Sequence, residues 1–340
     1  MKQVTRIAAL LPWLLLVLLG TTGRADEARL ILSVTPVAGL SVTVSVGNGP
    51  QRLVQVDTGS VGLIVWRGAI GPAAVPQGPG EREYNSSGRI FRGRYFLTRI
   101  AFQTPEGTVQ TVRLRVLGVE RQDCDPAKPD CPRQGGAALR QVGVLGVGFD
   151  RPAYTRGDLL DQSDNPFLNL EPMRDGSMPR RYMLSTHSIE LGGTASSPAG
   201  FAALPLTIRT HGQGGAPDDW ARPAACYTLT SSTDRHFGPV CTKLLVDSGL
   251  PEMILTLPPS QRPAGFACDP RCPNGWQATI RAGNALDWEF KTGEPGAPSY
   301  VRWGLNGNTT QINTGRTLLD HFDYLYDADL GIVGFRPVSH

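Results

Sequence analysis

The chain has 340 residues and a formal net charge of +3, a length that suits one large domain or two of ordinary size. Lys2, Arg6 and Arg24 account for the excess charge, so the rest of the chain is close to neutral. No basic block remains that would indicate binding to nucleic acid or to an anionic membrane surface.

The first 25 residues are typical of a secretory signal peptide. Lys2 and Arg6 precede an apolar run, residues 7–19, and small residues follow up to Ala25. Such an order of charged, apolar and small residues marks a segment that is removed after export. The run is short for a membrane span, and no second long apolar run follows. We therefore expect cleavage near Ala25 and an exported protein, periplasmic or secreted, without a membrane anchor.

The rest of the chain predicts an all-β protein. It contains 40 Gly and 28 Pro, and short runs of Val, Leu, Ile and Tyr alternate with polar residues before they end at turn residues. Residues 47–50, GNGP, and 327–331, DADLG, predict hairpin turns. Helices should be few and short, and residues 157–180 predict a loop with about one helical turn. The stretch 195–224, rich in Pro and Gly, is placed to join or separate two lobes.

Six cysteines lie as three couples of near neighbours. An even number in an exported protein favours disulfides, although the sequence does not fix their connectivity. The alternative is a metal site, because CDPAKPDC and CDPRC place thiols close together, but no His cluster accompanies them, and we expect no metal. The couples are Cys124 with Cys131, Cys226 with Cys241, and Cys268 with Cys272.

Two segments share one pattern: a hydrophobic strand that ends in Asp, then a small hydroxyl residue, then Gly. They are residues 53–60, LVQVDTGS, around Asp57, and residues 243–250, KLLVDSGL, around Asp247. By average residue usage, one such tripeptide arises by chance in roughly one protein in ten of this length, and two arise in roughly one in a hundred. The doubled pattern therefore favours a functional role over two unrelated turns.

Asp57 and Asp247 are candidates for a paired carboxylate site. Two carboxylates held close together cannot both ionise cheaply, so the pair shares one proton and titrates as a unit. Such a pair activates water as a general base while it protonates a carbonyl oxygen as a general acid. The Gly after each Asp allows close approach of backbone. For either Asp alone, a turn residue that caps a loop is the simpler interpretation.

The two segments resemble the active-site loops of the pepsin-like aspartic peptidases, in which each of two lobes donates one Asp. The likeness covers about residues 38–338 and implies a bilobal, all-β fold with lobes 26–195 and 196–340. It implies an endopeptidase that binds polypeptide in extended form, acts as a monomer and uses no cofactor. Beyond the two Asp loops, the resemblance rests on residues 41–52, 144–147, 188–193, 324–327 and 331–335, and on Cys241, for which Cys226 is the implied partner.

The resemblance also implies roles for the residues that follow each Asp. Thr58 and Ser248 would form hydrogen bonds across the lobe boundary beneath the pair. Ser60 would donate to the outer oxygen of the first Asp. Gly59 and Gly249 would complete the two loops.

Tyr84 and Trp66 are the candidates for substrate binding. By the resemblance, Tyr84 would close over substrate on a flap, and Trp66 would line the pocket of the first lobe. Both lie at a spacing that differs from that of the family. The alternatives are an ordinary strand or turn aromatic for Tyr84 and core packing for Trp66.

Three features depart from the family pattern. Leu250 replaces the second outer hydroxyl, and residues 313–315, NTG, replace two hydrophobic residues and Gly in the support of the second loop. Only residues 26–38 separate the signal segment from the first hairpin, too few for an inhibitory pro-segment. A carboxylate that loses a hydrogen bond to its charged form ionises less readily. We therefore expect activity shifted to less acidic pH rather than abolished.

The sequence allows two other functional interpretations. VDSGLP around Ser248 superficially resembles the nucleophile segment of trypsin-like peptidases, but these need a catalytic His early in the chain, and the first His here is His187. The alternative to an active peptidase is a pepsin-like fold kept as a peptide- or protein-binding module that is catalytically weak or inactive, because fold does not fix function.

Overall fold

A computed structural model gives the fold of the protein. It describes residues 27–30, 32–35, 39–84, 86–128, 131, 135–150, 162–194, 198–209, 219–263, 268, 271–304 and 310–338. The predicted signal segment, residues 1–25, lies outside the described residues. Strands make up most of the described residues, so the prediction of an all-β protein is confirmed.

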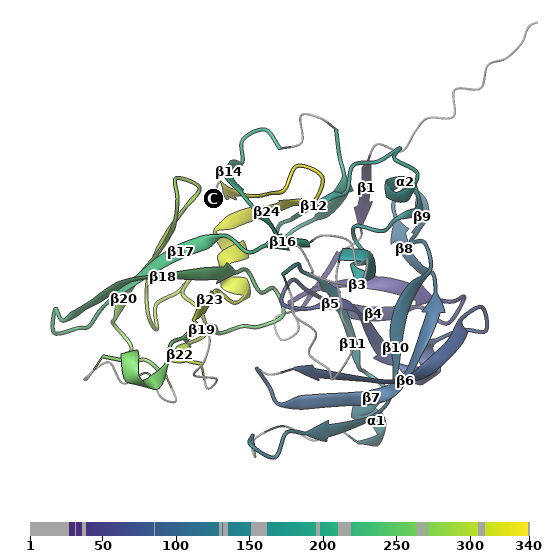
Figure 1. The fold of residues 1–340 in the computed structure, drawn as a ribbon, viewed down its shortest axis with the longest axis horizontal. Helices are drawn as coiled ribbons and strands as arrows, with labels where there is room; N and C mark the ends of the chain where they lie inside the picture. Colours follow the sequence, from purple (N-terminus) through teal and green to yellow (C-terminus); the bar gives the residue numbers. More distant parts are fainter. Residues whose placement is uncertain are drawn as a thin grey trace, which may run out of the picture.

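The first half of the sequence forms a ten-stranded sheet, which lies on the right of Figure 1. Its strands are β2 (Leu32–Thr35), β3 (Gly39–Val46), β4 (Arg52–Asp57), β5 (Val61–Trp66), β6 (Val75–Tyr84), β7 (Arg89–Thr98), β8 (Ile100–Thr104), β9 (Gly107–Gln110), β10 (Leu114–Cys124) and β11 (Gly143–Val147). The strand order is β6-β7-β10-β5-β11-β4-β3-β8-β9, with β2 beside β3. The strand that ends at Asp57 therefore lies inside the sheet, not at its edge.

A seven-stranded sheet, on the left of Figure 1, comes from the second half. Its strands are β17 (Ala224–Thr230), β18 (His236–Leu245), β19 (Met253–Thr256), β20 (Gln277–Ala282), β21 (Leu286–Lys291), β22 (Val301–Trp303) and β23 (Gln311–Asn313). They follow the order β21-β20-β17-β18-β23-β19-β22. The strand that leads to Asp247 is again an inner strand, β18.

A six-stranded sheet combines strands from both halves. It contains β1 (Glu27–Leu30), β12 (Arg181–Leu184), β13 (Ile189–Gly192), β14 (Ala202–Pro205), β24 (Phe322–Asp327) and β25 (Ile332–Pro337). Their order, β1-β13-β12-β24-β25-β14, places the final hairpin against β12. A small two-stranded sheet pairs β15 (Thr207–Arg209) with β16 (Asp219–Ala221). The six-stranded sheet thus links the two halves of the protein.

Helices are few and short among the described residues, as predicted. Residues 157–180, for which about one helical turn was expected, contain two short helical segments, η2 and α2, in their described part, residues 162–180. No helix of the described part is long and apolar enough to cross a membrane. The helices are α1 (Gly136–Leu139), α2 (Glu171–Arg174), η1 (Arg67–Ala69), η2 (Gln162–Asp164), η3 (Pro259–Gln261) and η4 (Arg316–Asp320).

Both predicted hairpin turns are present. At the turn between β3 and β4, Gly47 and Asn48 have the left-handed φ angles of 57° and 61°, and the Gly49 N–H donates to the Val46 carbonyl at 2.9 Å, which closes a tight turn. At the turn between β24 and β25, the Asp327 carboxylate accepts the N–H groups of Asp329 and Leu330 at 3.0 and 2.9 Å. Local sequence therefore sets the register of these two hairpins.

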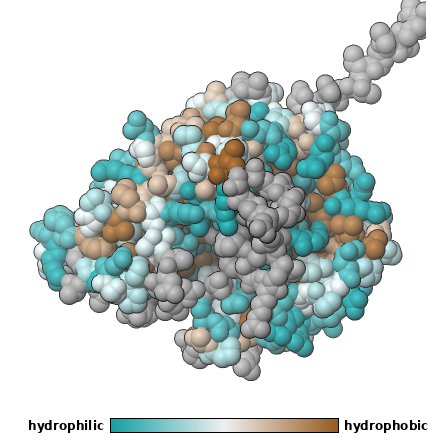
Figure 2. All heavy atoms as spheres, in the orientation of Figure 1, coloured by the Kyte–Doolittle hydropathy of each residue, from teal (hydrophilic) through white to brown (hydrophobic). Residues whose placement is uncertain are grey.

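One large buried cluster of apolar side chains extends through the three large sheets. Val56 and Leu145 belong to it in the first half, and Leu244 and Ile312 in the second, all at most 2% exposed. Full burial of such side chains contributes about 1.5–3 kcal/mol each. On the face drawn in Figure 2, hydrophilic residues in teal alternate with apolar patches in brown. The core therefore holds the strands beneath both Asp residues.

Candidate functional site

Asp57 and Asp247 stand at matching places in the two halves of the fold. Asp57 ends β4, and Asp247 follows β18 by two residues. Each of these strands has a parallel neighbour on one side, β11 beside β4 and β23 beside β18. The two Asp residues are 6% and 5% exposed, and both line one cavity of about 1750 Å³.

The carboxyl groups of Asp57 and Asp247 lie close together. A Cβ atom built on Gly249 would lie 2.5 Å from Asp57 Oδ1 and 3.2 Å from Asp247 Oδ1. The two oxygens are therefore no further apart than the sum of these distances, which is about the span of two hydrogen bonds to a shared water molecule. A Cβ atom on Gly59 would lie 2.6 Å from all three carboxyl atoms of Asp247. Glycine is needed in both loops because any side chain would displace a carboxylate.

Each carboxylate accepts one backbone and one side-chain hydrogen bond. Asp57 Oδ1 accepts the Gly59 N–H at 2.7 Å, and Asp57 Oδ2 accepts the Ser60 hydroxyl at 2.5 Å, as expected from the sequence. Asp247 Oδ1 accepts the Gly249 N–H at 3.0 Å. Asp57 and Asp247 are therefore alike in their backbone hydrogen bonds, and both residues line the cavity.

The second side-chain donor comes from a residue whose role the sequence did not reveal. Asn313 Nδ2 donates to Asp247 Oδ2 at 2.6 Å. The expectation that Asp247 lacks an outer hydrogen bond, because Leu250 has no hydroxyl, is therefore wrong. Asp247 therefore keeps an outer hydrogen bond to its charged form, and the replacement of a hydroxyl by Leu250 gives no reason to expect activity at less acidic pH. The available signal was a polar residue, Asn313, at a place where a hydrophobic residue was expected.

Thr58 and Ser248 connect the two Asp loops, as predicted. The Thr58 N–H donates to Ser248 Oγ at 3.0 Å, and the Ser248 N–H donates to Thr58 Oγ1 at 2.9 Å. Each hydroxyl also donates to the carbonyl before the opposite Asp, Thr58 to Val246 and Ser248 to Val56, both at 2.7 Å. All of these polar groups are buried, so the network fixes one loop against the other.

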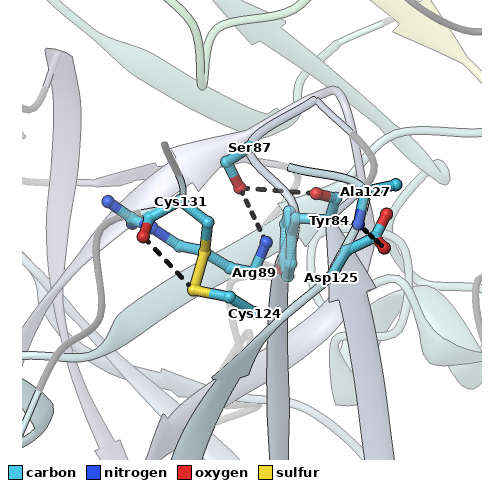
Figure 3. The surroundings of a disulfide bond; sticks show 7 residues. All are labelled: Tyr84, Ser87, Arg89, Cys124, Asp125, Ala127 and Cys131. Carbon is cyan, nitrogen blue, oxygen red and sulfur yellow. Dashed lines mark hydrogen bonds between the residues drawn. A yellow bond between two sulfur atoms is a disulfide. The ribbon is translucent and has the colours of Figure 1, made fainter. Parts of the chain in front are cut away.

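Tyr84 lies at the tip of the β6–β7 hairpin and lines the cavity. Its ring meets Phe91 edge-on, with 5.7 Å between ring centroids. Figure 3 shows the ring beside the turn, where Ser87 Oγ donates to the Tyr84 carbonyl at 3.4 Å. The hairpin is supported along its length, because β10 pairs with β7 as far as Cys124 opposite Arg89. The structure thus places Tyr84 at the end of β6, on the wall of the cavity.

The prediction that Trp66 lines the pocket is not supported. Trp66 is absent from the cavity wall, and its ring packs over Gly68. The ring also lies near two guanidinium groups, those of Arg52 and Arg140, at 5.4 and 5.8 Å. The physical reason is the turn into η1, which begins directly after Trp66 and keeps the ring away from the cavity.

All six cysteines form disulfides, in the near-neighbour couples named above: Cys124–Cys131, Cys226–Cys241 and Cys268–Cys272. The thiols are therefore bonded to each other and not available as metal ligands. Within the described part of the protein, no group of three or more His, Cys, Asp or Glu side chains is arranged to hold a metal ion.

The cavity wall carries more positive than negative side chains. Besides Asp57 and Asp247, the acidic residue among the described lining residues is Glu83. The basic lining residues are Arg82, Arg89, Lys128, Arg222, Lys243 and Arg302.

Two of these cations, Arg222 and Lys243, bind the buried Asp150. The Asp150 carboxylate lies 3.3 Å from Arg222 Nε, 3.1 Å from Lys243 Nζ and 2.6 Å from Arg209 Nη1. Burial by itself raises the pKa of Asp150, but the Arg222 N–H bond and the charges of Arg222 and Lys243 outweigh it and leave the pKa below its ordinary value. Asp150, just after β11, thus joins the first half of the protein to the second through charge.

A scan of the sequence against models of protein families finds no match, and a search of curated proteins finds none either.

Proposed function

We propose that the protein is an aspartic endopeptidase with a pepsin-like, two-lobed fold. The observation that carries the proposal is the arrangement of Asp57 and Asp247. They lie on loops from two separate sheets, within reach of one water molecule, at the wall of a large cavity. The matching strand pairing around each Asp, with β11 beside β4 and β23 beside β18, supports one Asp per lobe.

The proposed chemistry needs the two carboxylates in different protonation states. Close carboxylates share a proton, so one acts as a base and the other as an acid. The ionised carboxylate removes a proton from the water held between Asp57 and Asp247, and that water attacks the peptide carbonyl carbon. The protonated carboxylic acid gives its proton to the carbonyl oxygen. The carboxylic acid formed from the base then gives its proton to the leaving nitrogen, while the other carboxylate takes back a proton from a hydroxyl of the tetrahedral intermediate, and the C–N bond breaks without a covalent enzyme intermediate.

The substrate is proposed to be a polypeptide bound in extended form. A cavity of about 1750 Å³ that is lined by residues of both halves has room for several residues of such a polypeptide. Tyr84 on the β6–β7 hairpin would cover the scissile bond, and apolar lining residues such as Phe91 and Ile254 would contact neighbouring side chains. Apolar walls with a few placed polar groups are typical of binding sites.

Export is part of the same proposal. Three disulfides indicate folding in an oxidising compartment. The positively charged start and apolar run of residues 1–25 supply the corresponding export signal.

A catalytically inactive binding module is the alternative. Two sequence features favour this alternative most: Leu250 and the altered support of the second loop at residues 313–315. The hydrogen bond from Asn313 to Asp247 weakens both arguments, because it supplies the donor that Leu250 lacks and comes from the altered support itself. The unusual sequence spacing between Asp57 and Tyr84 still favours the inactive binding module.

The direct test is hydrolysis of an unfolded protein substrate between pH 3 and 7. We expect Asp57→Asn and Asp247→Asn each to lower the rate by about 10³-fold or more, because each removes one partner of the acid–base pair. Asp287→Asn, an exposed Asp paired with Arg281 at 3.1 Å, is the matched control and should keep the wild-type rate. Equal rates for Asp57→Asn and the wild type would disprove the mechanism. A statine-type inhibitor should bind the wild type tightly, because it resembles the tetrahedral intermediate.

A further inference from the structure

Asn313 occupies the place in the second half that Val144 occupies in the first. Val144 on β11 pairs with the residue two positions before Asp57. Asn313 on β23 pairs with the residue two positions before Asp247. Both strands also pair antiparallel with the strand that follows the Asp loop, β5 or β19. The two positions are therefore equivalent in register and in sheet environment.

A polar and an apolar side chain have exchanged places between the two halves. In the first half Ser60, the third residue after the Asp, supplies the outer hydrogen bond, and Val144 is apolar. In the second half Leu250, the third residue after the Asp, is apolar, and Asn313 supplies the hydrogen bond. Each half thus provides one outer donor, from the Asp loop itself in the first half and from β23 in the second.

The Asn313 amide is held in the orientation that this bond requires. Its Oδ1 accepts the Gly315 N–H at 3.0 Å, so its Nδ2 points at Asp247 Oδ2, at 2.6 Å. The side chain is 4% exposed, so water does not compete for the donor. An amide does not titrate, and it donates to the ionised carboxylate at any pH.

We propose that Asn313 is a positioning residue that compensates for Leu250, by holding the ionised form of Asp247 and the direction of its carboxylate. Asp57 is the titratable group that faces Asp247 across the site. Arg316 lies near the second Asp loop. A Cβ atom built on Gly39 would lie 3.1 Å from Arg316 Nη1 and 3.4 Å from the Ser248 carbonyl oxygen. The effect of Asn313 on catalysis rests on the proposed peptidase function, whereas its effect on the titration of Asp247 does not.

The test is a cycle of Asn313→Val, which copies Val144, and Leu250→Ser, which copies Ser60. Asn313→Val should lower kcat/KM about 10- to 100-fold and move the acidic limb of the pH–rate profile upward. The double variant should recover most of both losses, because Ser at position 250 restores an outer donor. Thermal unfolding of each variant shows whether it is folded.

A second readout does not depend on catalysis. The carboxyl ¹³C shift of Asp247, in protein labelled at aspartate, should titrate at higher pH in Asn313→Val and return in the double variant. The proposal is overturned if Asn313→Val titrates and cleaves as the wild type does. It is also overturned if the folded double variant stays as impaired as Asn313→Val, since a purely structural role of Asn313 would not respond to a hydroxyl at position 250. If the wild type cleaves nothing, the titration alone decides.

A separate observation concerns one end of the cavity, where cations from both halves come together. Arg89 on β7 and Lys128 on the loop after β10 approach from the first half, and Arg302 on β22 approaches from the second. The aliphatic part of Lys128 lies against the tip of the β6–β7 hairpin. A Cβ atom built on Gly88 would lie 2.8 Å from both Cβ and Cδ of Lys128. The loop is closed by the Cys124–Cys131 disulfide, which Figure 3 shows beside Arg89.

Lys128 and Arg302 are held near one another although they repel. Burial lowers the pKa of Lys128, Arg302 lowers it further, and Asp125 and Glu83 act in the opposite direction. Arg302 lies 3.5 Å from one carboxylate, that of Glu252. Arg89 is half-buried, and its guanidinium has no ion pair among the described residues. Bringing cations into a partly dry site is costly unless an anion joins them.

From this second observation we infer that this end of the cavity binds a carboxylate of the substrate, from an acidic side group or from the free carboxyl end of a peptide. The cleavage test rests on the proposed function, and a binding test does not. Peptides that differ only in Glu or Gln at each position flanking the cleaved bond, with free or amidated C-termini, distinguish the two sources. Binding of the same peptides, labelled with a fluorophore, is followed by anisotropy.

We expect the carboxylate peptide to have about tenfold higher kcat/KM and affinity than its neutral partner, with the preference reduced at high salt. Lys128→Met and Arg302→Met should remove most of the preference, so that each variant cleaves and binds charged and neutral peptides nearly alike. Lys291→Met, an exposed cation paired with Glu294 at 3.2 Å, is the control. Equal cleavage and equal binding of charged and neutral peptides would overturn the inference. If no peptide is cleaved, the peptidase proposal fails, and the anisotropy series still decides the inference.

Discussion

Thr58 and Ser248 stand 190 residues apart in the sequence, and each donates its backbone N–H to the hydroxyl of the other, at 3.0 and 2.9 Å. The reciprocal bonds bring together two loops that belong to different sheets. Because each hydroxyl also donates to the carbonyl before the opposite Asp, the position of each carboxylate depends on the opposite half. The geometry of the site is therefore a property of the whole fold.

This network leads to a prediction about stability. Thr58→Val and Ser248→Ala should each lower the free energy of unfolding by about 1–3 kcal/mol, since each leaves buried polar groups without partners. The double variant should lose less than the two single losses together, because both act on one network. Urea unfolding measures all three. Thr108→Val, at an exposed position, should change stability by less than about 0.5 kcal/mol. Strictly additive losses would contradict the coupling.

A second prediction concerns the close approach of the two loops. Gly249→Ala should lower kcat by about 100-fold or more, because the new Cβ would lie 2.5 Å from Asp57 Oδ1 and force the carboxylates apart. Gly78→Ala is the matched control, since nothing lies within 4 Å of a Cβ at that position. Steady-state kinetics on one peptide checks both variants. Full activity of a folded Gly249→Ala would show that the spacing of the carboxylates is not critical.

A third prediction is the pH dependence of stability at Asp150. Its pKa is lower in the folded protein than in the unfolded state, so the unfolded state binds the proton more readily. The stabilisation by Asp150 is therefore complete above the ordinary Asp pKa of about 4, and it is lost as pH falls through the lower folded value. Asp150→Asn should lower the free energy of unfolding by about 2–4 kcal/mol at neutral pH.

Denaturant unfolding at a series of pH values tests this. The difference between the wild type and Asp150→Asn should shrink as the pH falls below about 4. Asp323→Asn removes a more exposed pair with Arg336 and should cost about 1 kcal/mol or less. A difference between the wild type and Asp150→Asn that is constant with pH would contradict the role of the Asp150 charge.

A fourth prediction concerns the disulfide beside the hairpin tip. In the double variant Cys124→Ser/Cys131→Ser, the loop that supports the tip loses its closure, and the free energy of unfolding should fall by about 2 kcal/mol. KM should rise several-fold while kcat changes less, because Asp57 and Asp247 are held by other contacts. Cys268→Ser/Cys272→Ser removes a disulfide whose cysteines are not among the cavity-lining residues and serves as the comparison. Equal effects of both double variants on KM would contradict a specific role of the Cys124–Cys131 loop.

Several features could be predicted from short stretches of sequence. Alternating apolar residues gave the all-β class, and GNGP and DADLG gave two hairpins, because strand periodicity and turn chemistry act over a few residues. The near-neighbour cysteine couples matched the observed disulfides, since short loops keep such thiols close. Trp66 was misplaced because the path of the backbone after β5, and not the residue type, decides which way its ring points.

By itself the sequence determined the two Asp-Thr/Ser-Gly loops and the strands that carry them, since these depend on local residue order. Only the tertiary structure decided which residue completes the hydrogen bonds of Asp247. Asn313 lies 66 residues beyond Asp247 in the sequence and reaches it because β23 pairs beside β18. A donor that is brought in by sheet pairing leaves no signal beside Asp247 in the sequence. Leu250 was therefore recognised as a loss, while the polar residue at position 313 was noted as a departure without its connection to Asp247.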